Sequence, residues 1–140
     1  MDYKLLNISS TAFYANGIIP SKYTRLVENV NPPLNIDQIT QKAKSLAIVM
    51  VERNAPEDTR THWVLWNLPT MSQINENEVS GEQGMNDFGS LGYSGPCSPR
   101  EICQYIFKVY ALDDMLQLLK GACRRDLEDG LRYHTILMES

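Results

Sequence analysis

Three runs of apolar residues dominate the hydrophobic pattern of the chain and predict the strands of a β domain. Residues 45–51 (SLAIVMV) are short, continuously apolar and β-branched, which is typical of a central strand buried on both faces. Residues 61–68 (THWVLWNL), which end at Pro69, and residues 103–112 (CQYIFKVYAL), which alternate in part, favour two further strands. We therefore expect a mainly β fold built around these three segments.

The more polar segments predict the connections and one edge strand. Residues 3–8 are short and mixed in character, so they favour an edge strand. Residues 36–44 are expected to form one short helical turn, residues 57–60 a charged turn and residues 71–79 a surface loop. The resulting prediction is a mostly antiparallel arrangement of strands.

After the third strand the spacing of apolar residues becomes helical. A helix is expected to begin at Asp113 or Asp114 and to end at Gly121. Four residues would form its buried face: Met115, Leu116, Leu118 and Leu119. A second helix, with two leucines at helical spacing, is expected over residues 124–133. The sequence thus predicts short helices at the C-terminal end of the β domain.

One loop is unusually rich in glycine and proline. Residues 86–99 (NDFGSLGYSGPCSP) contain glycines that permit unusual backbone angles and prolines that fix a torsion. Phe88 and Tyr93 provide apolar groups that can hold the loop in one conformation. An ordered loop of this kind typically presents its backbone groups to a ligand. Because it leads into the strand at residues 103–112, we expect a functional site here.

Composition and charge exclude several classes of protein. The 140 residues suffice for a single domain, and 43% apolar and 21% charged residues are ordinary for a soluble protein. A formal charge of −4 without a basic stripe argues against a nucleic-acid partner, and the apolar runs are too short to span a membrane. The N-terminus lacks the apolar core of a signal peptide. Cys97, Cys103 and Cys123 lack the doublet spacing of a zinc site, so we expect reduced thiols, no metal and a cytoplasmic protein.

Three residues at the ends of predicted strands could carry chemistry. His62 begins a strand and is either a structural, hydrogen-bonded histidine or a functional one. Glu52 and Cys103 are either a solvated carboxylate and a small buried side chain or members of a site. In the second case Cys103, His62 and Glu52 could form a thiol nucleophile with its base. The sequence contains no G-x-S-x-G, H-E-x-x-H, P-loop or dinucleotide motif to support an enzyme.

Several motifs are spread over most of the chain. They are STAF (10–13), GIIP (17–20), NPPL (31–34), KSLA (44–47), ERNAP (52–56), HWVLWNLP (62–69), GMNDFG (84–89), GYSGPCSP (92–99) and YALD (110–113). With these motifs the chain resembles the phosphatidylethanolamine-binding protein family (Raf kinase inhibitor protein-like), in its bacterial form. The two glycine-rich motifs are the most specific part of the resemblance.

The resemblance implies a fold, a pocket and a set of pocket residues. The fold would be an antiparallel β-sandwich with short C-terminal helices, formed by residues 1–140 as one domain. The pocket would bind a small anion, such as phosphate or a phosphoethanolamine headgroup, without metal or cofactor. The residues at pocket positions are Glu52, Asn54, Pro56, His62, Gly95, Pro96, Cys103 and Tyr105.

This sequence departs from the family pattern at several of these positions. Glu52 and Asn54 replace two aspartates, and Arg53 replaces the proline between them. Cys103 and Gln104 replace a His-Arg pair, which removes an imidazole and a permanent cation. Loss of one charge-assisted donor costs roughly 1.5–3 kcal/mol, or about ten- to a hundredfold in affinity. We therefore expect an anion pocket that is weak or degenerate.

Two further departures lie outside the pocket motifs. Residues 25–27 (RLV) stand where the family has Cys-Asp-Gly. Tyr133 and His134 resemble the start of the last family motif, and we expect the strand that follows it in the family to be missing.

Three functions remain open from the sequence. The first is a non-catalytic, regulatory binding protein with a small anion pocket. The second is a module for a protein partner or a homodimer, with a vestigial pocket. The third is the thiol enzyme with Cys103 and His62.

Overall fold

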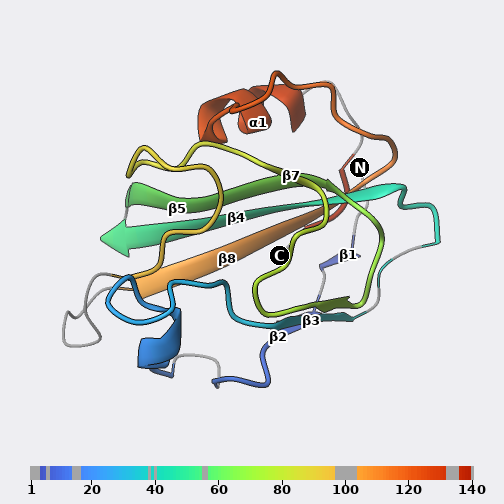
Figure 1. Ribbon diagram of the computed structural model, residues 1–140. Helices are drawn as coiled ribbons and strands as arrows, with labels where there is room; N and C mark the ends of the chain where they lie inside the picture. Colours follow the sequence, from blue (N-terminus) through green and yellow to red (C-terminus); the bar gives the residue numbers. More distant parts are fainter. Residues whose placement is uncertain are drawn as a thin grey trace.

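Two β-sheets packed face to face form the body of the structure (Figure 1). The computed structural model describes residues 4–5, 7–13, 17–37, 39, 41–54, 57–96, 104–131 and 136–139. Within these residues one sheet has six strands and the other three. In spatial order the larger sheet consists of β1 (Lys4–Leu5), β9 (Ile136–Glu139), β8 (Gln104–Leu112), β4 (Ser45–Asn54), β5 (Glu57–Leu68) and β7 (Glu82–Gln83), and the smaller sheet of β2 (Asn7–Ser9), β3 (Leu34–Asp37) and β6 (Gln73–Ile74). Neighbouring strands are antiparallel except β1 and β9, which are parallel.

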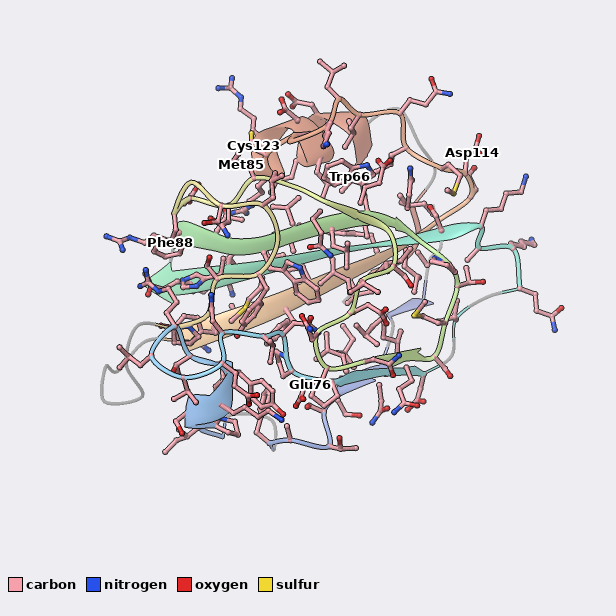
Figure 2. The ribbon with its side chains drawn as sticks, in the orientation of Figure 1. Trp66, Glu76, Met85, Phe88, Asp114 and Cys123 are labelled. Atoms are coloured by element: carbon pink, nitrogen blue, oxygen red, sulfur yellow. The ribbon has the colours of Figure 1, made fainter. Side chains whose placement is uncertain are left out.

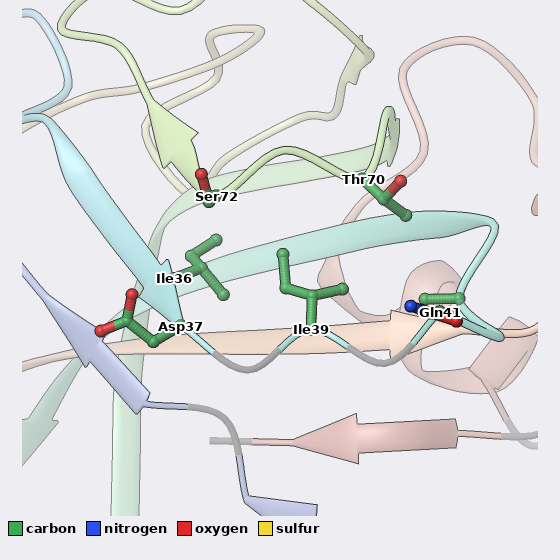
Figure 3. Close-up of a pocket in the computed structure, with 7 residues that line it drawn as sticks. Ile36, Asp37, Ile39, Gln41, Thr70 and Ser72 are labelled. Atoms are coloured by element: carbon green, nitrogen blue, oxygen red, sulfur yellow. The ribbon is translucent and has the colours of Figure 1, made fainter.

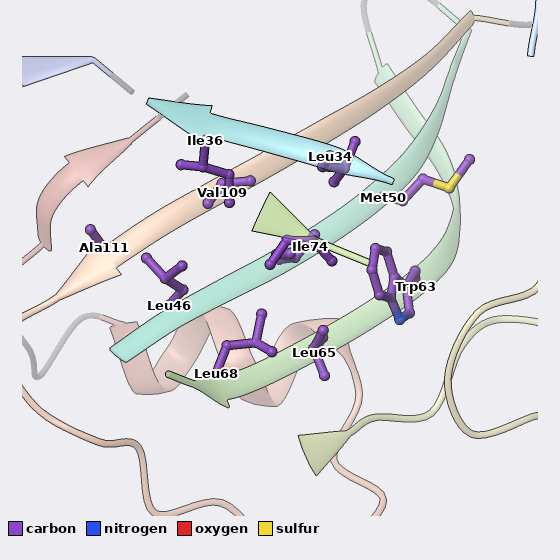
Figure 4. Close-up of a cluster of buried hydrophobic side chains, with 11 residues drawn as sticks. Leu34, Ile36, Leu46, Met50, Trp63, Leu65, Leu68, Ile74, Val109 and Ala111 are labelled. Carbon is purple, nitrogen blue, oxygen red and sulfur yellow. The ribbon is translucent and has the colours of Figure 1, made fainter. Parts of the chain in front are cut away.

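Strand β4 is buried on both faces, as its continuous apolar sequence predicted. Leu46, Ile48 and Met50 pack toward the smaller sheet, in a cluster that includes Ile36 and Ile74 (Figure 4). The intervening residues belong to a second cluster on the opposite face: Ala47, Val49 and Val51. Because successive side chains of a strand point to opposite faces, both faces of the larger sheet need a cover.

Helix α1 (Arg124–Leu131) covers the second face of the larger sheet, at the top of Figure 1. Leu127 and Leu131 are buried there together with Trp66 of β5. The carboxylate of Asp126 accepts a hydrogen bond from the Cys123 backbone N–H at 3.1 Å, which satisfies a donor at the start of the helix. The described part of the chain contains no helix long and apolar enough to cross a membrane.

The helix expected between residues 113 and 121 is not formed, so that prediction was wrong. The side chain of Asn67 donates to the carbonyl of Leu116 at 2.8 Å and accepts from its N–H at 2.7 Å. The hydroxyl of Ser45 donates to the carbonyl of Asp114 at 2.7 Å. Strand side chains therefore bind backbone groups that a helix would need for its own hydrogen bonds. The side chains predicted to share one buried face do not do so, because Leu116 is buried and Leu119 is exposed.

Four other local expectations also differ from the structure. Residues 57–60 are the first part of β5 rather than a charged turn, and residues 34–37 form β3 where a helical turn was expected to start. The expected loop at 71–79 contains β6, whose Ile74 is fully buried. The C-terminal strand expected to be missing is present as β9, which pairs with β8 and β1.

Candidate functional site

His62 is the centre of the candidate site and lies in the middle of β5 (Glu57–Leu68). Its side chain is buried, with 1% exposure. Its ring nitrogen Nδ1 lies 2.7 Å from the backbone carbonyl of Ser94. A carbonyl only accepts, so Nδ1 carries the proton and, in the neutral ring, Nε2 carries a lone pair. That Nε2 atom is buried and has no hydrogen-bond partner within the described part of the chain.

The Gly/Pro loop that carries Ser94 is held by the side chain of Asn86. Its amide donates to the carbonyl of Gly92 at 3.0 Å and to the hydroxyl of Ser94 at 3.0 Å. Its oxygen accepts from the backbone N–H groups of Phe88 and Ser90. The asparagine of the NDFG motif therefore sets the shape of the loop, and with it the carbonyl that orients His62.

Gly95 is where a second segment packs against this loop. A side chain at this position would place its Cβ 1.9 Å from the carbonyl oxygen of Tyr23, so only glycine permits the contact. Tyr23 ends the short 3₁₀ helix η1 (Ser21–Tyr23). The Gly95 N–H donates to the side chain of Asn29 at 2.8 Å, and the Arg25 N–H donates to the carbonyl of Pro96 at 2.9 Å.

Three backbone donors in the described part of this loop are used within the fold. Ser94 N–H donates to the carbonyl of His62 and Gly92 N–H to that of Gly84, while Gly95 N–H is held by Asn29. The sequence resemblance implied that the loop would offer its N–H groups to an anion. In the structure these three donors are occupied, whereas His62 Nε2 is a polar atom next to the loop without a partner among the described residues.

Aromatic rings surround the imidazole. The rings of Phe88 and Tyr105 lie edge-on to it, with centroids at 4.8 and 5.2 Å. Figure 2 shows Phe88 at the end of the larger sheet where β4 ends and β5 begins. The hydroxyl of Tyr105 lies 3.4 Å from Oε1 of Glu52, its register partner on β4. The Arg25 guanidinium lies over the Phe88 ring, 4.2 Å from its centroid.

The surroundings favour the neutral form of His62. Burial is the largest cause and lowers the pKa of the imidazole below its ordinary value. The Ser94 carbonyl and the charge of Glu52 oppose this by raising the pKa, while the nearby charge of Arg25 lowers it further. The ring is therefore a buried base whose protonation would respond to a new negative charge.

The structure brings together five of the eight predicted site residues. Glu52, His62 and Tyr105 come from neighbouring strands, and the loop with Gly95 and Pro96 lies against His62. Asn54 is placed in β4 opposite Glu57, where the structure describes only its backbone. Pro56 and Cys103 lie outside the described residues, so the thiol hypothesis stays a prediction.

Sequence reasoning missed three contributors to the site. Phe88 was assigned only to holding the loop, Ser94 was not singled out, and Arg25 appeared only as a departure from the family pattern. The contact of Arg25 with Phe88 joins segments 63 residues apart, and no spacing rule signals it. The motif position of Phe88 between two glycines was the one available hint.

Other candidate sites in the described residues are less well built. No group of three or more His, Cys, Asp or Glu side chains there could hold a metal ion. A hollow of about 410 Å³ lies between β3 and residues 70–72 (Figure 3), and another of about 380 Å³ lies beside Trp63 and Gln83. His62 lines neither hollow.

Comparison with known proteins identifies the family. The sequence model described as phosphatidylethanolamine-binding protein matches residues 9–139. This chain belongs to the phosphatidylethanolamine-binding protein family. Among curated relatives it is 44% identical over 138 residues to a UPF0098 protein of Pyrococcus horikoshii, covering 91% of this chain and 70% of the relative. A UPF0098 protein of Methanothermobacter thermautotrophicus is 40% identical over 139 residues, with coverage of 94% and 92%.

Solved structures of this family confirm the predicted sandwich. A phosphatidylethanolamine-binding protein homologue from Chlamydia trachomatis superposes with a TM-score of 0.87 at 29% identity, covering 97% of this chain and 93% of that one. YbcL of E. coli has a TM-score of 0.81 at 21% identity, with coverage of 96% and 94%, and supports the fold alone. The relatives come from archaea and bacteria, so the expected bacterial form of the family remains a prediction.

Proposed function

We propose that this member of the phosphatidylethanolamine-binding protein family is a cytoplasmic, non-catalytic binding protein for a small phosphate-type anion. The ligand would be phosphate or a phosphoethanolamine-like headgroup, held at His62. One observation carries the proposal: Nε2 of the buried His62 has no hydrogen-bond partner among the residues that the structure describes, while Nδ1 is fixed on the Ser94 carbonyl. A buried, oriented and unpaired polar atom is costly for a fold that has no use for it.

Binding at this atom couples an anion to one proton. When the imidazole is protonated, Nε2 becomes a donor and forms a charge-assisted hydrogen bond to an anion oxygen. When the ring is neutral, Nε2 accepts from a ligand that carries its own P–OH group. Burial and the charge of Arg25 favour the neutral ring in the free protein, and the charge of Glu52 opposes them. A bound anion adds a second negative charge next to the ring and therefore stabilises its protonated form.

The covering of Nε2 predicts weak binding. A ligand reaches the atom only by displacing a neighbouring group, and the rings of Phe88 and Tyr105 are among these neighbours. Phe88 is half-buried and lies on the loop, whereas Tyr105 belongs to β8. Moving a ring costs free energy, and the cation that the family has at position 104 is missing here. We therefore expect a dissociation constant near the millimolar range, which is a binding free energy of about −4 kcal/mol.

Calorimetric titration with phosphate tests the proposal. At pH 6 the unaltered protein should bind one phosphate, and binding should weaken as the pH rises to 8 because less His62 is protonated. His62→Gln removes the imidazole and should weaken binding about tenfold or more. Sodium chloride at the same ionic strength is the control. The proposal is wrong if no saturable heat of binding appears at about 20–50 mM phosphate, which is 20 to 50 times the expected dissociation constant. It is also wrong if His62→Gln binds phosphate as tightly as the unaltered protein.

A second candidate is an interaction module with a vestigial pocket, for a protein partner or a homodimer. The closed surroundings of Nε2 favour it, as do exposed apolar side chains on residues 17–29, a segment that packs against the Gly/Pro loop: Ile18, Leu26 and Val27. Sedimentation over a range of protein concentrations separates the two functions. A monomer at all concentrations that binds phosphate supports the anion pocket, whereas association without phosphate binding supports the module.

A further inference from the structure

Arg25 is an exposed cation in contact with the shell of aromatic rings around His62. Its guanidinium carbon lies 4.2 Å from the centroid of the Phe88 ring, whose own centroid is 4.8 Å from that of His62. A guanidinium over an aromatic face is held by attraction to the ring's electron density. The charge of Arg25 is also close enough to act on the imidazole of His62.

The backbone around Arg25 is fastened to the same loop that orients His62. The Arg25 N–H donates to the carbonyl of Pro96 at 2.9 Å. Two contacts flank it: the hydroxyl of Tyr93 donates to the Tyr23 carbonyl at 2.8 Å, and the Gly95 N–H donates to Asn29 at 2.8 Å. The position of Arg25 relative to His62 is therefore built into the fold and does not depend on the side chain alone.

The guanidinium has no carboxylate partner among the described residues. The ion pairs of this region join Lys22 to Glu28 and Glu76, and Arg25 takes part in none of them. The guanidinium contacts Phe88 through the face of the ring, and this contact uses none of its N–H groups as hydrogen-bond donors, so they can donate to a ligand. The edge of a planar guanidinium matches two oxygens of a phosphate or carboxylate.

A second arginine lies farther from the same ring. The Arg60 guanidinium carbon is 5.8 Å from the Phe88 centroid. Arg25 is nearer to the ring, at 4.2 Å, so it is the better placed of the two to bind a ligand beside Phe88.

We propose that Arg25 is the cationic arm of the anion site, donating from its guanidinium edge to oxygens of an anion whose remaining oxygen meets Nε2 of His62. The inference rests on the proposed function and adds to it a permanent charge that the position of Gln104 lacks. It also specifies the ligand class: an oxyanion with several free oxygens on one centre, such as phosphate or a phosphomonoester. A diester has fewer free oxygens and would bind less well.

Calorimetric titration of matched charge variants with phosphate tests whether Arg25 binds the anion. Arg25→Gln should weaken binding roughly three- to tenfold, which is less than for a buried charge-assisted donor because Arg25 is exposed. Arg25→Lys keeps the charge without the planar edge and should recover part of the loss. Arg125→Gln removes the same charge from an exposed position on α1 and should leave the affinity unchanged.

The outcomes separate this inference from the function on which it rests. If Arg25→Gln binds phosphate like the unaltered protein while His62→Gln loses binding, the anion site stands and the role of Arg25 is wrong. If the unaltered protein binds no phosphate, both proposals fail. A second readout needs no ligand: Arg25→Gln should raise the pKa of His62 in the free protein, and an unchanged value would place Arg25 too far from the site.

Discussion

At the scale of single residues, the environment of His62 links its protonation to folding. Burial lowers the pKa of the imidazole in the folded state, whereas the unfolded chain has the ordinary value of about 6.5. The unfolded state therefore binds more protons in the interval between the two values. The contribution of neutral His62 to stability is fully present above pH 6.5 or so and is lost as the pH falls below it.

This argument predicts an acid-sensitive fold whose sensitivity depends on one side chain. Between pH 7 and 5 the free energy of unfolding should decrease, with a slope contribution from His62 of at most about 1.4 kcal/mol per pH unit. Urea unfolding at several pH values measures the slope. His62→Gln should have a shallower slope whatever its stability at pH 7. An equal slope in both proteins would contradict the assignment of the lowered pKa.

At the scale of elements, residues 113–121 show how tertiary contacts override local spacing. The apolar residues are spaced for a helix, but the side chains of Asn67 and Ser45 bind the backbone of this segment. Asn67 itself has φ of 54°, a left-handed conformation that asparagine tolerates better than most residues. The segment is therefore irregular and buries only part of its apolar side chains.

Two leucine substitutions distinguish this arrangement from the helix expected from the sequence. Leu116→Ala should lower the free energy of unfolding by about 2–5 kcal/mol because its side chain is buried in the core. Leu119→Ala should change it by less than about 0.5 kcal/mol because the side chain is 87% exposed. Chemical denaturation measures both. A helix with a buried leucine face would instead make the two losses similar.

At the scale of the whole molecule, much of the fold was predictable from the sequence. The continuous apolar run at β4 predicted a strand covered on both faces, and the glycine-rich motifs indicated the family sandwich. Short strands such as β6 and β9 were missed because two to four residues carry too little pattern to recognise. Their pairing is decided by partners distant in sequence, which no local pattern contains.

The site was predictable only where a motif carries it. His62, Gly95 and Tyr105 were found because they occupy motif positions, and the structure brings them to one end of the larger sheet. The occupied loop donors and the position of Arg25 depend on how residues 21–29 pack on the Gly/Pro loop. Those contacts join segments that are far apart along the chain, so they follow from the fold and not from the sequence pattern.

One measurement tests the central claim, that Nε2 of His62 is the open position of an anion site. The chain has two histidines, so His134→Gln leaves His62 as the one imidazole to observe by NMR. Without phosphate, its pKa should lie below the ordinary value, and Nδ1 should carry the proton of the neutral ring. With saturating phosphate the pKa should rise, because the anion stabilises the protonated ring. A pKa at its ordinary value that phosphate does not change would contradict the account.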